Sequence, residues 1–421
     1  MPAVRPRSAR STSFRLTGSI TIDASGSRIL TINSGSSSVK FALYRMTGSE
    51  QLQLHGLIER IGVGHGLFHA EDEAGRTLTE DQLPLPDHDA ALQALLGWLG
   101  SHEGGYTVDA VGHRVVHGGA KHSQPERVTP ELMAALRELI PLAPDHLPHE
   151  IKAIEAVERH YPASQQVACF DTAFHRQMPE LAQVYALPRG PEFRDVIRYG
   201  FHGLSCEYIM GELRAEAGDE TADGRVIVAH LGNGASIIAL RGGRSVDTTM
   251  GFTPTGGLVM STRSGDLDPS VVLYLIEEKG LSPADVRDLL NHRSGLLGLS
   301  GQTSDMRDLL EREATDARAA LAVALFCYQA TKFLGALAAA LGGLDTLIFT
   351  GGIGENAAAI RRRICEKVGF LGLRLDPDRN DASAPIISRD DSPVSARVMK
   401  TDEELMIARH TYRVVRELRR P

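Results

Sequence analysis

The sequence predicts an α/β protein with two domains, and three observations support this. The chain has 421 residues, more than a single hydrophobic core normally organises. Strand-like and helix-like segments alternate along most of the chain, which is typical of the α/β class. Two strand–turn–strand segments with tips of small polar residues occur at residues 29–44 and 226–240. Each half of the chain is therefore predicted to open with a hairpin.

The first 28 residues differ in composition from the rest. Arg5, Arg7, Arg10 and Arg15 lie among Ser, Pro and Thr, and no acidic residue precedes Asp23. This segment, residues 1–28, is predicted to be a disordered extension or an over-extended start of the chain. A transit-like peptide is the alternative, whereas the sequence has no apolar core of a secretory signal here.

The first hairpin joins strands expected at 29–32 and 39–44 through the small polar residues 33–38. Small residues let backbone N–H groups and hydroxyls converge on an anion, because no bulky side chain blocks the approach. It is not a Walker A loop, since the GxxxxGK[ST] spacing is absent and a strand follows. Phosphate binding and an ordinary polar turn both remain open from this segment alone.

Two arginines stand in segments rich in glycine. Arg114 follows a short apolar strand expected at 108–111, and Arg263 lies in the loop 262–266. A guanidinium pairs bidentately with carboxylate or phosphoryl oxygens, so two of them suit a reaction that joins these groups. Taken singly, an arginine in a loop is usually a surface residue.

Asp171 ends a strand expected at 167–172, where α/β enzymes commonly collect active-site carboxylates. A helix cap is the alternative, because Thr172 and a helical pattern follow. His202 stands between glycines in the segment 199–203, but with 16 histidines in the chain a single one says little.

The second hairpin joins strands expected at 226–231 and 235–240 through Gly232, Asn233 and Gly234. An Asn-Gly pair is a strong hairpin signal, and a type I′ turn is its simplest interpretation. Since both halves of the chain carry such a tip, the two tips are predicted to hold a polyphosphate between them.

A third strand, expected at 344–350, runs into the turn 351–356 and a helix at 357–368 that Gly369 ends. Free N–H groups at a helix start suit an anion or nucleotide. The spacing is not GxGxxG, and a plain strand-to-helix connection is the alternative. Further helices are expected at 130–140, 149–159, 283–290 and 402–418. Before the last, Thr401 and Glu404 have capping-box spacing, which by itself explains the acidic run.

Composition limits the environment of the protein. The apolar run 319–341 is interrupted by Gln329 and Lys332, so it is predicted to be a buried core helix and not a membrane span. A net charge of −8 and a pI near 6.1 disfavour a nucleic-acid or anionic-membrane partner. The cysteines lack CxxC or metal spacing and are predicted to be buried thiols of a cytoplasmic protein; they are Cys169, Cys206, Cys327 and Cys365.

A series of short blocks, in order from Ile29 to about Arg409, carries a specific resemblance. The blocks are NSGSSSVKF, GHRVVHGG, FDTAFH, RYGFHGLS, HLGNGAS, DTTMGFTPTGGL, TRSGDLDP, SGLLGLSG, SDMRDL, GGIGEN and TDEELMIA. Together they resemble the acetate kinase family, of the acetate and sugar kinase, heat-shock 70 and actin superfamily.

This resemblance implies two ribonuclease-H-like lobes, the actin-like ATPase fold, with a nucleotide cleft between them. The expected boundaries are 29–172 for the N-terminal lobe, completed by the helix 402–418, and 173–401 for the C-terminal lobe. The implied activity is reversible, direct in-line phosphoryl transfer between ATP and acetate, giving acetyl phosphate and ADP. Mg²⁺ or Mn²⁺ is implied as the cofactor and a homodimer as the assembly.

The resemblance also assigns roles to residues. The catalytic set is Asp171, Arg114, His202 and Arg263. The nucleotide set is Lys40, His230, Leu231, Gly232, Asn233, Gly234, Asp305, Met306, Arg307, Gly352, Ile353, Gly354, Glu355 and Asn356. The acid is expected at Arg114, Val116, Asp145, His146, Phe201 and Pro254, and the metal at Asn33 and Glu403. Because a carboxylate acceptor is already ionised at pH 7, no general base is required, and Asp171 is expected to orient Arg114 or a metal-bound water.

The chain departs from the family at three places. Asp145 stands where most relatives have a leucine of the acyl pocket, and an unpaired carboxylate is costly to bury there. Either the loop shifts, or Asp145 finds a partner, or the preferred acid is not simply acetate. Thr255-Gly256-Gly257 and Cys206 are also unusual, and the sequence assigns them no function.

Two other functions remain open. A propionate or short-chain fatty acid kinase uses the same machinery, and one methylene is worth only about 1–3 kcal/mol of discrimination. A non-catalytic nucleotide switch on the same scaffold is the remote alternative. The presence of Arg114, Asp171, His202 and Arg263 together argues against a switch, which needs no cations on the acid side.

Overall fold

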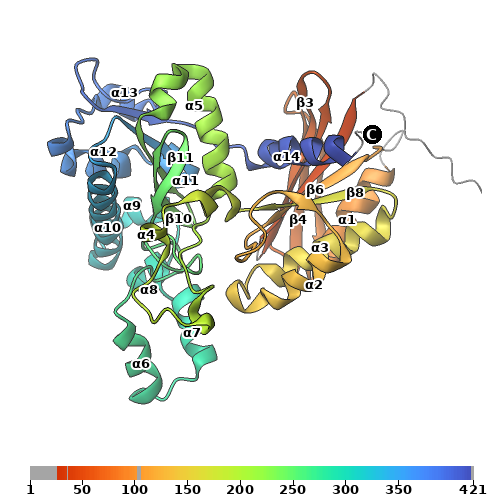
Figure 1. The fold of residues 1–421 in the computed structure, drawn as a ribbon, viewed down its shortest axis with the longest axis horizontal. Helices are drawn as coiled ribbons and strands as arrows, with labels where there is room; N and C mark the ends of the chain where they lie inside the picture. The colour runs from red at the N-terminus through yellow and green to blue at the C-terminus, as the bar shows by residue number, and fades with distance from the viewer. Residues whose placement is uncertain (1–25, 36, 102–105, 419–421) are drawn as a thin grey trace, which may run out of the picture.

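The protein folds into two lobes, each built on one β-sheet (Figure 1). The structure is a computed structural model that describes residues 26–35, 37–101 and 106–418. Most of the predicted N-terminal extension therefore lies outside the described residues, and its last two residues, Ser27 and Arg28, already belong to a strand.

The first lobe has an eight-stranded sheet in the order β5-β4-β3-β2-β1-β6-β8-β7. The strands β1 and β2 form the predicted first hairpin, and β1, β6 and β8 run parallel. The carboxyl ends of these three strands meet at one edge of the sheet, which brings Asn33, Arg114 and Asp171 together. The bounds are β1 Ser27–Ser34, β2 Ser38–Met46, β3 Glu50–Glu59, β4 His65–Asp72, β5 Thr77–Pro84, β6 Ala110–Val115, β7 Glu126–Arg127 and β8 Gln165–Phe170.

Helices cover both faces of the first sheet. Leu30 and Ile32 of β1 pack in one cluster with α1 (His88–Ser101) and α3 (Leu147–His160). The alternate residue Ile29 packs with the opposite helix α14 (Glu403–Leu418). This alternation is the period of two expected for a strand buried on both faces. Figure 1 shows α14, the last helix in sequence, lying against the first sheet.

The second lobe has a five-stranded sheet in the order β11-β10-β9-β12-β13. Its strands are β9 Arg225–Leu231, β10 Ala235–Arg241, β11 Arg244–Thr248, β12 Thr346–Thr350 and β13 Ser395–Val398. The helix α5 (Gly203–Asp223) packs on one face of this sheet and α10 (Ala317–Leu341) on the other. The strands β9 and β10 form the predicted second hairpin.

The helix α10 is, among the described residues, the one with the length and composition of a membrane span. Its inner face is buried against the second sheet and against the helices α8 (Gly295–Ser300), α9 (Met306–Arg312) and α12 (Ala358–Lys367). It is therefore a core helix, as predicted. All four cysteines are buried with free thiols, which also agrees with the prediction.

Shorter helices complete both lobes. In the first lobe these are α2 Pro130–Glu138 and a 3₁₀ turn, Ile140–Leu142. In the second they are α4 Glu180–Gln183, α6 Pro269–Glu277, α7 Pro283–His292, α8 Gly295–Ser300, α9 Met306–Arg312, α11 Gly351–Asn356, α12 Ala358–Lys367 and α13 Pro377–Asp381. Further 3₁₀ turns span Ala173–Gln177, Pro191–Phe193 and Gly369–Leu371.

Four local predictions were wrong. The turn 351–356 is itself the short helix α11, and the strand expected at 108–111 runs from Ala110 to Val115. The tip 232–234 is a three-residue loop without positive φ at these positions, so it is not a type I′ turn. The capping box at Thr401 is not formed, because the N–H of Leu405 is capped by the carboxylate of Asp402 at 2.7 Å.

Candidate active site

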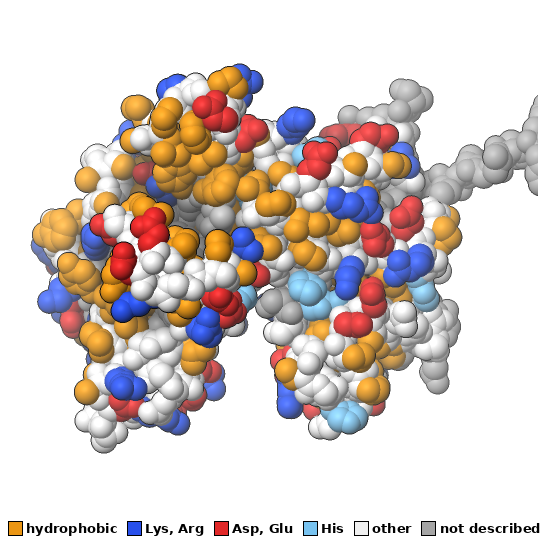
Figure 2. Space-filling view, turned by 90° about the horizontal axis from the view of Figure 1, so that it is seen from below, with side chains coloured by type: hydrophobic (Ala, Val, Ile, Leu, Met, Phe, Trp, Pro, Cys, Tyr) orange, Lys and Arg blue, Asp and Glu red, His pale blue; other side chains and the backbone are white. Residues whose placement is uncertain are grey.

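A cavity of about 760 Å³ lies between the two lobes. On the face drawn in Figure 2 the lobes are separated by a deep notch. The cavity is lined by the tips of both hairpins, by the starts of α9 and α14, and by α11. It brings together most of the residues predicted for nucleotide, metal and phosphoryl group: Asn33, Lys40, Arg114, His202, His230, Gly232, Asn233, Gly234, Asp305, Met306, Arg307, Gly352, Ile353, Glu355, Asn356 and Glu403.

Two predicted nucleotide residues do not line this cavity. Leu231 is fully buried at the end of β9. Gly354 is buried in α11, where a Cβ atom would lie 3.4 Å from the carbonyl carbon of Phe349 and 3.5 Å from the carbonyl oxygen of Ala229. Both residues therefore support the wall of the cavity from behind.

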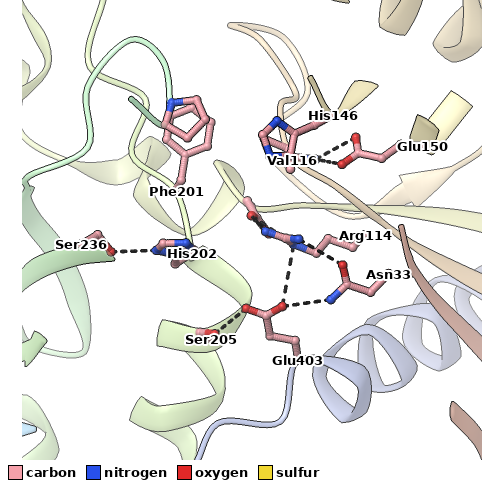
Figure 3. A network of polar contacts seen from close by, with 12 residues as sticks. Asn33, Arg114, Val116, His146, Glu150, Phe201, His202, Ser205, Ser236 and Glu403 are labelled. Atoms are coloured by element: carbon pink, nitrogen blue, oxygen red, sulfur yellow. Dashed lines mark hydrogen bonds and ion pairs between the residues drawn. The ribbon is translucent and has the colours of Figure 1, made fainter. Parts of the chain in front are cut away.

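Arg114 is the centre of a polar network at the edge of the first sheet (Figure 3). Its Nε and Nη2 donate to the two carboxylate oxygens of Asp171 at 3.0 and 2.6 Å, and its Nη1 donates to Oδ1 of Asn33 at 3.0 Å. Glu403 joins the network by accepting from Nδ2 of Asn33 at 3.2 Å and from the hydroxyl of Ser205 at 2.5 Å. Bidentate pairing fixes the plane of the guanidinium.

Burial and neighbouring charges shift the pKa values of the two acids in this network, Asp171 and Glu403. Burial raises the pKa of Asp171, and Arg114 beside it acts in the opposite direction. The pKa of Glu403 is lowered: burial disfavours the charged form, but Arg114, His230 and Lys40 together outweigh that cost. Glu403 is therefore an anion at neutral pH and faces the cavity.

Several buried oxygens next to Asn33 and Glu403 in the chain have no hydrogen-bond partner within the described ranges. They are Oγ of Ser34, Oγ1 of Thr401 and Oε1 of Glu404. Mg²⁺ prefers oxygen ligands, keeps several waters, and usually takes one or two carboxylates together with substrate phosphates. Thr401 and Glu404 line the cavity together with Asn33 and Glu403, so their oxygens fit such an ion and its waters. No cluster of three or more His, Cys, Asp and Glu side chains that could hold a metal by itself occurs among the described residues.

His202 links the network to the second lobe. It has the left-handed φ of 58° at the N-cap of α5, and the next N–H, of Gly203, donates to the carbonyl of Asp171 at 3.0 Å. Its Nδ1 lies 3.0 Å from the Ser236 hydroxyl, and its ring stacks on His230 with centroids 4.2 Å apart. Burial lowers the pKa of His202 well below its ordinary value. The neutral ring can donate one N–H to an anion.

Arg263 lies beside His202 and the second hairpin tip. A Cβ atom at Gly234 would lie 3.1 Å from Nε2 of His202 and 3.5 Å from Nη1 of Arg263. Arg263 donates to the carbonyl of Pro254 at 3.2 Å, and its Nη2 lies 3.4 Å from Nε2 of His146. Of the predicted catalytic set, Arg114 and His202 therefore line this cavity, Asp171 is bonded to Arg114, and Arg263 lies next to His202 at the tip Gly234.

The predicted acid site divides into two parts. Val116 and Phe201 are buried, and Figure 3 shows them on opposite sides of the space above Arg114, with His146 next to Val116. Asp145, His146, Pro254 and Arg263 line a second cavity of about 310 Å³ that α7 closes. Asp145 has found partners: it accepts from Nδ2 of Asn291 at 2.9 Å and lies 3.4 Å from Nε2 of His292.

Glu150 of α3 is a buried acid that sequence reasoning missed. It is 2% exposed, and its carboxylate oxygens accept from the N–H of Val116 at 3.2 and 3.1 Å. Burial raises the pKa of Glu150 to about 8, and Arg114 and this N–H act against the shift. It therefore holds the end of β6 from behind the predicted acid site.

The buried acid predicts a pH dependence of stability. Because the pKa of Glu150 is about 8 in the folded protein and about 4.3 in an unfolded chain, the folded state binds more protons between these values. Its contribution to stability is full below about pH 4 and is lost as the pH rises to about 8. In Glu150→Gln, the free energy of unfolding measured from pH 5 to 8.5 should decline less with rising pH than in the unchanged protein. The exposed Glu158→Gln on the same helix serves as the control and should follow the unchanged protein; an unaltered decline in Glu150→Gln would contradict the prediction.

Arg361 of α12 was also missed, although it holds α11, which lines the cavity. It is fully buried and donates to the carbonyls of Gly354 and Glu355 at 2.9 and 2.8 Å. Its other donors reach Asn380 and Ser383. The run Arg361-Arg362-Arg363 is typical of a solvated helix face, and only a helical phase taken from the buried Ile360 and Ile364 could have marked the first arginine as internal.

Comparison with known proteins places these features in a family. A model described as the acetokinase family matches residues 28–409. A protein named acetate kinase from Rhodopseudomonas palustris (strain TIE-1) is 51% identical over 392 residues, covering 92% of this chain and 98% of the relative. An acetate kinase of Coprothermobacter proteolyticus is 44% identical over 400 residues, covering 93% of this chain and the whole relative.

Solved structures agree with this comparison. The chain is 39% identical to the crystal structure of Porphyromonas gingivalis acetate kinase, with a TM-score of 0.81 over 93% of this chain and all of that one. It is 38% identical to a propionate kinase from Francisella tularensis, with a TM-score of 0.86 over 92% of this chain and all of that one. The chain belongs to the acetokinase family.

Proposed function

We propose that the protein catalyses reversible phosphoryl transfer between ATP and acetate, giving acetyl phosphate and ADP. The observation that carries this proposal is the arrangement of Arg114, His202 and Arg263 at one end of the cavity that both hairpin tips line. Curated relatives named acetate kinase, at 42–51% identity, support the same reaction.

The transfer itself needs positioning and charge more than covalent chemistry. The transferred group spreads negative charge over its equatorial oxygens while the attacking and leaving oxygens stand in line. Arg114, oriented by Asp171, binds the carboxylate of the acid in one direction and the acyl phosphate in the other. Arg263 and the N–H of neutral His202 face the transferring group. Because the acid is already ionised at pH 7, no residue has to remove a proton.

The nucleotide is assigned to the rest of the cavity. We assign Lys40 and the tip 232–234 to the phosphates, and the rest of the nucleotide to the remaining lining residues, which are Asp305, Met306, Arg307, Gly352, Ile353, Glu355 and Asn356. Asn33 and Glu403 would hold Mg²⁺, or Mn²⁺, which neutralises phosphate charge when bound. Lobe closure over this cavity would exclude water and limit hydrolysis of ATP.

Replacing Glu403 with glutamine is expected to raise the Mg²⁺ concentration for half-maximal activity by about tenfold or more, because affinity for hard cations follows the charge of the oxygen ligands. The exposed Glu417→Gln in the same helix is the matched control and should keep the original value. Direct titration of Mg²⁺ in the presence of ADP gives a readout besides activity. Equal Mg²⁺ affinities of Glu403→Gln and the control would remove Glu403 from the metal site.

A coupled assay with ATP, Mg²⁺ and a panel of acetate, propionate, butyrate and formate tests the function. The proposal expects turnover with acetate. A clear preference for propionate would establish the propionate kinase alternative, which the similarity to the Francisella tularensis structure favours. Tight nucleotide binding without turnover of any acid would instead support the non-catalytic switch and overturn the proposal.

We also infer the domain boundaries and the setting. The proposed lobes are 29–172 with 402–418, and 173–401, since α14 packs on the first sheet. A homodimer is supported by α6, which contains Val271, Leu273 and Tyr274 and has no buried residue. A second copy of the chain would cover this helix, and light scattering of the purified protein tests it. A cytoplasmic location without nucleic-acid or membrane partners is proposed from composition and from the relatives.

A further inference from the structure

Two positions at which the chain departs from the family pattern, Asp145 and Thr255, contact the same side chain. Asp145 accepts a hydrogen bond from Nδ2 of Asn291 at 2.9 Å, and the hydroxyl of Thr255 donates to Oδ1 of Asn291 at 2.8 Å. Asp145 belongs to the loop before α3 in the first lobe. Asn291 lies near the end of α7, and Thr255 lies in the loop 251–257, both in the second lobe. These three side chains, here called the Asn291 bridge, therefore connect the two lobes.

The direction of each hydrogen bond in the Asn291 bridge is fixed by chemistry. An ionised carboxylate only accepts, so Asp145 selects the NH₂ group of Asn291. The carbonyl oxygen of the same amide is then turned to the hydroxyl of Thr255. The backbone carbonyl of Asn291 also accepts from the hydroxyl of Thr262 at 2.7 Å. Asn291 is thus held in one orientation, and the bridge has one arrangement of donors and acceptors.

The two outer residues of the Asn291 bridge, Thr255 and Asp145, are each adjacent in sequence to a residue that contacts Arg263. Pro254, whose carbonyl accepts from Nη1 of Arg263 at 3.2 Å, precedes Thr255. His146, whose Nε2 lies 3.4 Å from Nη2 of Arg263, follows Asp145. Thr262, bonded to the backbone of Asn291, precedes Arg263 itself. The bridge therefore ties down the three segments that surround this guanidinium.

Charge supports the same arrangement. Burial lowers the pKa of Arg263, and the carboxylate of Asp145 acts against that shift. The hydrogen-bond partners of Arg263 among the described residues are uncharged, namely the carbonyl of Pro254, the sulphur of Met260 and the ring of His146. Asp145, which precedes His146 in the chain, compensates the charge of Arg263 without occupying its hydrogen-bond donors.

We propose that Asp145, Asn291 and Thr255 act as positioning residues, forming a bridge between the lobes that holds Arg263 and His146 in place for phosphoryl transfer. This inference rests on the proposed function. The bridge explains why a carboxylate is tolerated at 145: its side chain is 28% exposed and paired with Asn291 and His292. The acid substrate then meets Arg263 in a fixed position, while the nucleotide end of the cavity is independent of the bridge.

Variants of all three residues test the proposal by steady-state kinetics. Asp145→Leu and Asn291→Leu should each lower kcat/KM for the acid about tenfold, the size expected when a hydrogen bond to a charged group is lost. The double variant should lose about tenfold as well, not a hundredfold, because both changes break the same bridge. Thr255→Val should show a smaller loss that Thr255→Ser restores. The KM for ATP and the affinity for ADP should stay unchanged in all of them.

The control is Asp288→Asn, which alters an exposed acid in the same helix as Asn291, paired with Arg293 on the surface. Thermal unfolding of each variant shows whether the fold is retained. Multiplicative losses in the double variant, or an equal rise of the KM for ATP, would overturn the bridge while leaving the proposed function intact. If the unaltered protein turned over no acid, the proposed function itself would fail, which separates the two outcomes.

Discussion

Replacing Arg263 with alanine is expected to lower kcat about 10²–10³-fold, the loss found when one preorganised donor is removed from a transition state. The guanidinium of Arg263 is half-buried beside His202 and the tip Gly234, where charge on a transferring phosphoryl group would develop. Its present partners are uncharged. The cation is therefore available to an anion, and its strength is greatest when the lobes exclude water.

The measurement that decides this is the division of the loss between kcat and KM. An interaction made only in the transition state lowers kcat and kcat/KM equally, whereas uniform binding changes KM alone. Arg293→Ala is the matched control, since Arg293 pairs with Asp288 at the surface of the same lobe. A raised KM with unchanged kcat for Arg263→Ala would show that Arg263 binds the ground state and does not stabilise the transfer.

The parts of the fold that the sequence predicted correctly are those set by local patterns. The hairpin β1–β2 and the hairpin β9–β10 follow from apolar runs interrupted by small polar residues, and both tips line the cavity. The core helix α10 follows from its apolar composition with isolated polar residues. Strand ends and small-residue tips depend on neighbours in sequence, so a single chain contains the necessary information.

The features that the sequence predicted wrongly or missed depend on contacts between distant segments of the chain. The cap of α14 is Asp402 and not Thr401, a choice between adjacent polar residues that depends on how the chain enters the helix. Arg361 looks like a surface residue until Asn380 and Ser383, about twenty residues later, supply its acceptors. The partner of Asp145 is 146 residues away in sequence. No periodicity within one segment carries such information.

The predicted site residues converge for a topological reason. Asn33, Arg114 and Asp171 follow three parallel strands whose carboxyl ends share one edge of the first sheet. Glu403 reaches the same edge from α14, and His202 reaches it through the N–H of Gly203 bonded to the carbonyl of Asp171. The second cavity at Asp145 was not foreseen, because its walls come from segments that lie far apart in the sequence, namely the loop before α3, the loop after Gly251 and α7.

Asp171→Asn is expected to lower kcat/KM for the acid about 10²–10³-fold, because removing one partner of a buried ion pair costs about 3–5 kcal/mol. Asp171 is 1% exposed, and both of its oxygens accept from Arg114. Asparagine offers only one oxygen and places an NH₂ group against a guanidinium N–H, so the guanidinium of Arg114 is no longer held in one orientation. The KM for ATP should change little, since Asp171 does not line the cavity to which the nucleotide is proposed to bind.

A second substitution separates orientation from direct chemistry. If Asp171 acts through Arg114, then adding Asp171→Asn to a protein that already carries Arg114→Ala should not lower kcat/KM for the acid any further. The guanidinium that Asp171 orients is already absent from that protein. If Asp171 acts on the substrate or on a water, the two losses multiply. The exposed Asp391→Asn, in the second lobe, controls for the loss of a carboxylate as such. We expect the non-additive result. The Nε and Nη2 of Arg114 donate to Asp171, and its Nη1 donates to Asn33. The carboxylate of Asp171 therefore determines the orientation of the guanidinium.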